Sequence, residues 1–148
     1  MNQSVFAVVA ALVGGVLLAL QPPTNAMLAR GVGSTVNAAM ISFIVGALAL
    51  MAAAAVLHAK PELSQAKALP WWAWVGGAYG AVFVFAIAYG APRIGVAAVL
   101  TLAIAAQLAT AVTVDHFGWL GLARRPLDWT KAIGVVMVFA GALLVRKG

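Results

Sequence analysis

Long runs of apolar residues alternate along the chain with short polar breaks. A hydrocarbon core about 30 Å thick needs roughly 20 helical residues, at a rise of about 1.5 Å each. Cutting the chain at its charges, glycines and prolines leaves five segments of about that length: approximately residues 4–27, 36–57, 71–91, 94–114 and 129–145. The sequence therefore predicts an all-α integral membrane protein with five transmembrane helices, forming one domain over residues 1–148.

The breaks between these segments have local physical causes. Glycines in residues 31–34 predict a turn, and residues 60–70 form a polar hinge with a proline near each end. Pro92 and Arg93 interrupt an apolar stretch that is too long for one span. Residues 115–128 keep an apolar middle, so we expect this segment to lie along the membrane interface.

The composition excludes a water-soluble fold. Hydrophobic residues make up 65% of the chain and charged residues 8%, against roughly 45–50% and about 25% in soluble domains. The net charge of +6 comes from residues that stand singly or in pairs at the ends of apolar runs, which indicates contact with lipid headgroups and no nucleic-acid partner. Without cysteine, and with only His58 and His116, the chain predicts no metal site and no cofactor.

Basic residues are nearly balanced between the two sides of the membrane. With five spans, the side of the N-terminus carries five of them, and the opposite side carries four. The five are Lys60, Lys67, Arg124, Arg125 and Lys131, and the four are Arg30, Arg93, Arg146 and Lys147. Because an excess of Lys and Arg in cytoplasmic loops sets orientation, this balance predicts that the chain inserts both ways up.

Small residues recur at helical spacing on several of the predicted spans. Helices in lipid associate through close backbone approach, which such residues permit. Gly134 and Gly141 lie a heptad apart on one face of the helix at 129–145. Packing within one chain and packing between subunits both explain these stripes. Five helices make a thin bundle, so we favour a homodimer with this face as its interface.

Amide side chains are the most informative polar groups within the spans, because an unpaired amide costs several kcal/mol in hydrocarbon. Gln21 and Asn25 share one face of the first helix, and Pro22 and Pro23 between them remove two backbone donors and bend the helix. The carbonyls freed in this way and the two amides can bind a neutral or cationic ligand. The alternative is that the amides only repair the kink.

Further along the chain, Gln107 lies near the middle of the helix at 94–114, and Thr110 shares its face. Tyr79 can add a ring and a hydroxyl to the same cavity. Asp115 is the only carboxylate near a span, so it is the one candidate for coupling to protons. It can instead anchor the helix end at the headgroups or pair with Arg124 or Arg125.

Four short stretches together resemble the YdcZ-type family of small bacterial inner-membrane proteins. They are QPPTNA at residues 21–26, ISFIVG at 41–46, WWAWVGG at 71–77 and DHFG at 115–118. The last helix, with Gly134 and Gly141, also resembles the end of an EamA-type half in the drug/metabolite transporter superfamily. The resemblance implies a five-helix half-transporter in which a second, inverted copy supplies the other half. The superfamily's small multidrug branch uses a carboxylate in helix 1, whereas this helix carries Gln21 and Asn25.

Together these observations predict a bacterial inner-membrane transporter for a small polar or weakly charged molecule. It would work as an antiparallel homodimer by alternating access. The predicted substrate-binding residues are Gln21, Asn25, Tyr79, Gln107 and Thr110, with Asp115 as the coupling group. The alternative is a non-transporting subunit or regulator of a larger membrane complex. An enzyme is not expected, because the spans contain no catalytic pair.

Overall fold

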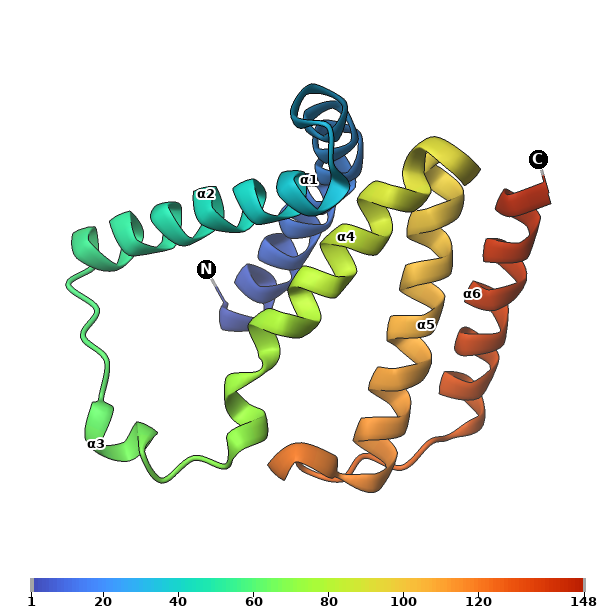
Figure 1. Cartoon of the computed structure of the whole chain (residues 1–148). Helices are drawn as coiled ribbons and strands as arrows, with labels where there is room; N and C mark the ends of the chain where they lie inside the picture. Colours follow the sequence, from blue (N-terminus) through green and yellow to red (C-terminus); the bar gives the residue numbers. More distant parts are fainter. Residues whose placement is uncertain (1, 148) are drawn as a thin grey trace. The chain divides into compact units, whose positions relative to one another are not determined.

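The computed structural model describes residues 2–147. These residues form helices and include no strand. Five helices in this part of the chain are long and apolar enough to cross a membrane. They are α1 (Gln3–Val32), α2 (Thr35–Val56), α4 (Gly76–Ile94), α5 (Val96–Phe117) and α6 (Trp129–Lys147), shown in Figure 1. The short helices α3 (Leu63–Ala66), η1 (Trp71–Trp74) and η2 (Trp119–Gly121) lie between them. The predicted all-α architecture with five spans is confirmed.

The turn between the first two helices is shorter than the sequence indicated. Helix α1 continues through Gly31 to Val32, and its C-cap is Gly33, whose φ of 72° lies in the left-handed region. The next residue, Ser34, already caps α2, since its hydroxyl accepts the amide hydrogen of Asn37 at 3.3 Å. A left-handed glycine followed by a serine cap is sufficient to end one helix and start the next. The turn expected over residues 31–34 is therefore confined to Gly33 and Ser34.

The break between α4 and α5 lies at Gly95 and not at Pro92 and Arg93, where the sequence placed it. Helix α4 contains Pro92 and extends to Ile94. A proline removes one backbone hydrogen bond, and this helix ends within a turn of it. Gly95 has φ 86° and ψ 150°, a conformation essentially restricted to glycine. The chain therefore reverses at the residue that can adopt this backbone.

We expect Gly95→Ala to destabilise the protein by about 1–3 kcal/mol, the usual cost of forcing a side chain into a sparsely populated backbone region. The measurement is the thermal unfolding of the purified protein in detergent, followed by circular dichroism. Gly31→Ala is the matched control, because Gly31 is helical and a Cβ there would meet nothing within 4 Å. An equal loss of stability in both variants would contradict this role for Gly95.

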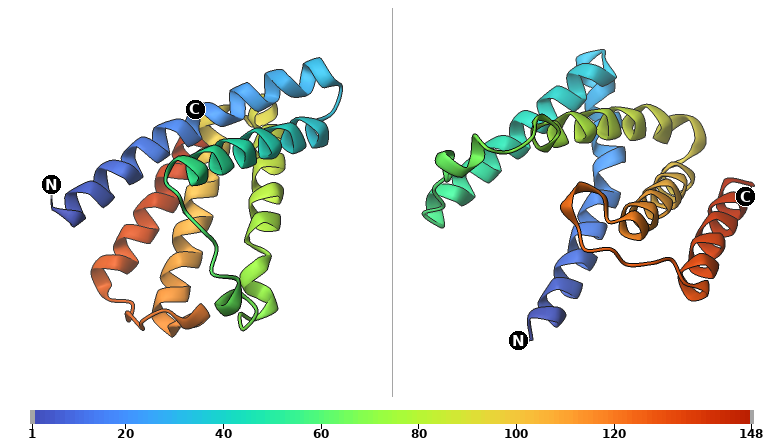
Figure 2. Two further views of the ribbon diagram at one scale, coloured as in Figure 1. Left: turned by 90° about the vertical axis from the view of Figure 1, so that its left-hand side faces the viewer. Right: turned by 90° about the horizontal axis from the view of Figure 1, so that it is seen from below.

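The described residues group into two compact units that divide between Tyr89 and Gly90. In the first unit, α1 and α2 pack against each other after the turn that joins them, and Ala38 is fully buried (Figure 2). In the second unit, α5 packs along α6, with Ala105 and Ala142 buried. Buried alanines let helix backbones approach closely, which is the main source of packing energy between helices in lipid. The grouping of all five spans into one domain stays a prediction.

Gly90 allows a close approach at the start of the second unit. A Cβ at this position would lie 2.8 Å from Cγ2 of Val99 in α5. Such a distance is too short for two carbon atoms, so any other residue would push the end of α4 away from α5. Gly90 and Gly95 together shape the tight connection between these helices.

Candidate functional site

Helix α1 carries two consecutive prolines, Pro22 and Pro23, and continues through both. Because proline has no amide hydrogen, the carbonyl oxygens four residues earlier have no helical donor. These carbonyls belong to Leu18 and Ala19. A segment that crosses the membrane therefore lacks the usual helical hydrogen bond at two of its carbonyls.

The hydroxyl of Thr24 forms hydrogen bonds with the neighbouring backbone. It donates to the carbonyl of Leu20 at 3.1 Å and to that of Gln21 at 2.8 Å. The amides of Gln21 and Asn25 make no hydrogen bond to the backbone around the prolines. In the described chain it is thus a threonine, and not the two amides, that contacts carbonyls beside the prolines.

Asn25 is the buried polar residue of the first unit, with 4% of its surface exposed. The hydroxyl of Ser42, on α2, donates to its Oδ1 atom. A buried amide in an apolar surrounding needs such a partner, so this bond joins α1 to α2 at a polar contact. Among residues 2–147 no fully buried side-chain nitrogen or oxygen lacks a partner. Nδ2 of Asn25, which has no hydrogen bond, therefore reaches accessible space.

A groove of about 270 Å³ opens beside this contact, within the first unit. Its lining includes Gln21 from α1, Ser42, Phe43, Gly46 and Leu50 from α2, and Val84 from α4. Two hydrogen-bonding side chains thus face a mostly apolar wall that carries no ionisable group. Such a groove suits an uncharged polar group better than an ion, which would lose its hydration without gaining a counter-charge.

Gln21 is placed to bind a ligand in this groove. Its side chain is half-buried and makes no hydrogen bond to any residue of the described chain. It also borders a second hollow of about 450 Å³ along α1, next to Gly14, Leu17 and Thr24. An amide that is held at a groove inside a membrane span and has no protein partner can donate to and accept from a bound molecule.

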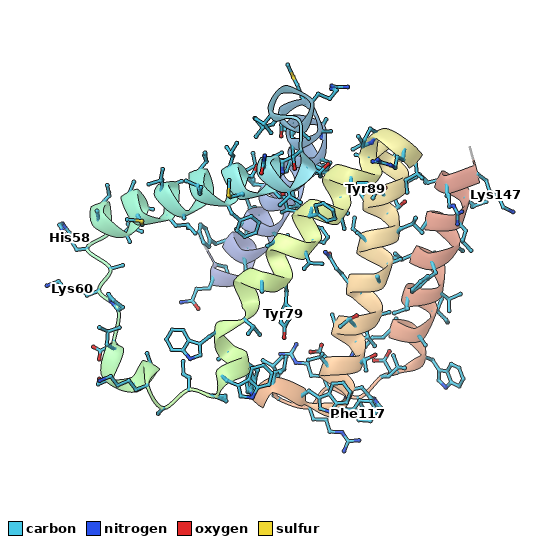
Figure 3. The ribbon with its side chains drawn as sticks, in the orientation of Figure 1. His58, Lys60, Tyr79, Tyr89, Phe117 and Lys147 are labelled. Carbon is cyan, nitrogen blue, oxygen red and sulfur yellow. The ribbon has the colours of Figure 1, made fainter. Side chains whose placement is uncertain are left out.

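Tyr79 lies on α4, in the same unit, but it does not line the groove. Its side chain is 68% exposed and is labelled in Figure 3. The structure therefore places Gln21 and Ser42, the partner of Asn25, at one groove, and leaves Tyr79 on an exposed face. A place for Tyr79 in the pathway stays a prediction.

Gln107 and Thr110 belong to the second unit and lie on α5. The Thr110 hydroxyl donates to the carbonyl of Ala106, one turn earlier, at 2.9 Å. Gln107 is exposed and makes no hydrogen bond within the described chain. Threonine can satisfy its donor on its own helix, whereas a glutamine cannot do so easily. Of the two, Gln107 is the polar group that still needs a partner in the membrane.

Asp115 lies two residues before the end of α5 and is half-buried. In residues 2–147 its carboxylate forms no ion pair with Arg124 or Arg125. Its carbonyl instead accepts the amide hydrogen of Arg125 at 2.7 Å. Nearby, Arg124 donates from Nε to the carbonyl of His116 at 3.0 Å, and the amide of Leu127 donates to His116 Nδ1 at 2.9 Å. The following loop thus folds back onto the end of α5 and leaves the Asp115 carboxylate without a basic partner.

The glycines of α6 lie in open space. A Cβ at Gly134 or Gly141 would meet nothing within 4 Å. The packing of α6 on α5 buries Ala142 and does not use these two positions for a close approach. The face that carries both glycines is therefore free within the second unit.

Comparison with known protein families identifies the family of this chain. Residues 6–144 match the family described as "Putative inner membrane exporter, YdcZ". The chain belongs to this family. It is accordingly a protein of the inner membrane and a transporter rather than an enzyme. Searches of curated proteins and of solved structures gave no significant match.

Proposed function

We propose that the protein exports a small polar or weakly charged molecule as an antiparallel homodimer, by alternating access. The observation that carries this proposal is the groove in the first unit that Gln21 and Ser42 line, with the Ser42 hydroxyl bonded to the buried Asn25. Polar groups at such positions are costly unless they have a partner. A passing substrate supplies partners for Gln21, for Nδ2 of Asn25 and for the carbonyls freed by the prolines.

A second copy completes the pathway in this proposal. Gln107 is exposed on α5 without a hydrogen-bond partner among residues 2–147, and the glycine face of α6 is open. Both features favour contact with another protein surface over contact with lipid. The balance of five basic residues against four supports copies of opposite orientation, which allow two identical halves to alternate around one site.

Gln107, Thr110 and Tyr79 are the further substrate contacts that we propose, and Asp115 is the coupling group. The Asp115 carboxylate is free of Arg124 and Arg125 and lies at the end of a span, where water can reach it. If Asp115 couples substrate transport to proton movement, we expect Asp115→Asn to transport substrate without dependence on a proton gradient. If Asp115 only anchors the helix end, the variant should depend on the gradient as the unchanged protein does.

Reconstitution of the purified protein alone into liposomes tests the proposed function. Uptake of small polar and weakly charged compounds into these vesicles, above that of protein-free vesicles, supports a transporter. The other candidate, a non-transporting subunit or regulator, predicts no uptake of any compound and the co-purification of a larger membrane partner.

Gly141→Leu tests the dimer interface on α6. A leucine would fill the open face, and overpacking of about 1.4 kcal/mol lowers the dimerisation constant about tenfold. The measurement is the yield of cross-linked dimer in detergent as a function of protein concentration. Ala140→Leu is the control, because Ala140 is exposed on the same helix but lies about 100° around it. Unchanged cross-linking of Gly141→Leu would exclude this face.

A further inference from the structure

A second, apolar groove lies beside the polar one, within the first unit. It has a volume of about 420 Å³, and its lining includes Ala39, Met40 and Phe43 from α2 and Ala81, Val82 and Phe85 from α4. No polar side chain lines it. The two grooves therefore offer hydrogen bonds in one place and only apolar contact in the next.

Phe43 lies at the boundary between the two grooves, since it lines both. Its ring rests against the backbone of α4 at Gly80, where a Cβ would lie 3.1 Å from Cζ. The absence of a side chain at Gly80 lets the ring lie close to α4. A ligand that extends from the polar groove along α2 and α4 would therefore pass the edge of this ring.

The chemistry of the two linings defines the ligand that fits them together. Neither lining contains an ionisable residue, so a charged group would be desolvated without a counter-charge. Gln21 can donate to and accept from a compact neutral group, and the Ser42 oxygen, whose proton is donated to Asn25, can accept from it. An apolar body attached to that group would replace lipid chains in the apolar groove.

We propose that the substrates are uncharged amphipathic molecules, with a hydrogen-bonding head at Gln21 and Ser42 and an apolar tail past Phe43 in the groove between α2 and α4. This inference rests on the proposed transport function and names its substrate class. The apolar groove is finite, so it accepts tails only up to a limiting length. The polar groove contacts only the head of the molecule.

N-alkylureas, from methylurea to dodecylurea, provide a test because their head is neutral and both donates and accepts hydrogen bonds. Binding to the purified protein in lipid nanodiscs is measured by equilibrium dialysis, with protein-free nanodiscs as the background. We expect the affinity, relative to free ligand in water, to rise about fourfold per methylene while the tail is being buried. It should then level off at one chain length. Alkylammonium ions of equal length should bind at least about tenfold more weakly.

Ala81→Leu narrows the apolar groove and should lower the affinity for the longest bound ureas about tenfold, while methylurea stays within about twofold. Met40→Ala widens the groove and should move the plateau to longer tails. Because this second variant only removes atoms, it keeps the test valid if Ala81→Leu folds poorly. Ala86→Leu is the control, since Ala86 is exposed on α4 and lines neither groove.

The outcomes separate this inference from the proposed function. A tail-length preference that is unchanged in both Ala81→Leu and Met40→Ala would mean that membrane lipid fills the apolar groove. This result would overturn the inference without affecting the transport shown by vesicle uptake. Equal or tighter binding of the alkylammonium ions would overturn the uncharged class. Uptake of no compound in liposomes, despite length-dependent binding in nanodiscs, would refute transport and leave the binding site in place.

Discussion

Replacing Gln21 by leucine is expected to lower substrate uptake about thirtyfold. The reason is the loss of one hydrogen bond, worth roughly 2 kcal/mol when the substrate's polar group is left unpaired in an apolar groove. Gln21 has no partner in the described chain, and leucine is stable in lipid, so the folded protein and its dimer should persist. The measurement is initial uptake into liposomes that contain equal amounts of each variant.

Gln3→Leu is the matched control for this change. Gln3 is exposed at the first turn of the same helix, away from the prolines. We expect Gln107→Leu to abolish uptake as well, with intact expression and dimerisation, because the proposed pathway needs its amide. Normal uptake by Gln107→Leu would show that α5 is not part of the substrate site. Normal uptake by Gln21→Leu would show that the groove beside Asn25 is not part of it.

Fixing the orientation of the chain is expected to abolish transport, and mixing the two orientations should restore it. Ser64→Lys with Gln65→Lys changes the balance of basic residues to seven against four, which favours one orientation. Lys60→Gln, Lys67→Gln and Arg125→Gln together change it to two against four and favour the other. All the positions are exposed and lie between the spans, two of them in the short helix α3. If the dimer is antiparallel, each set alone lacks its inverted partner.

Uptake by each set alone should fall at least about tenfold, and co-expression of both sets should recover it. Reporters at the C-terminus, one active only in the cytoplasm and one only outside, verify the orientation of each set. Lys60→Arg with Lys67→Arg keeps the charge and serves as the control. Full uptake by either set alone, with a single verified orientation, would show that inverted copies are not required.

The number of spans was predictable from the sequence because a bilayer imposes it. Hydrocarbon about 30 Å thick requires about 20 helical residues whatever their neighbours are, so charges and turn residues mark the ends. The ends of α2 and the start of α6 lie within one residue of the predicted positions. The break at Gly95 was misplaced by a few residues. Proline does not need to end a helix at once, whereas a backbone conformation restricted to glycine must fall on a glycine.

The candidate site was predictable only in part. Gln21 and Asn25 stood out because amides are rare and costly within apolar helices. Ser42 stands out in the sequence only as part of the ISFIVG stretch at residues 41–46, although its hydroxyl binds Asn25 from another helix. A serine within a span does signal that its hydroxyl needs a partner, but its distance of 17 residues from Asn25 hides which partner it takes. Thr24, which contacts the carbonyls beside the prolines, carried no signal beyond its position.

The sequence by itself determined that this chain spans the membrane five times and carries its few polar groups on particular helix faces, since both follow from local residue types and from lipid as the solvent. Only the tertiary structure decided which polar groups meet and which apolar walls surround them. The contact between Asn25 and Ser42 and the two grooves at Phe43 depend on how separate helices approach. That approach is set by the packing of small residues of one helix against another helix. The periodicity within a single helix does not show which other helix it packs against.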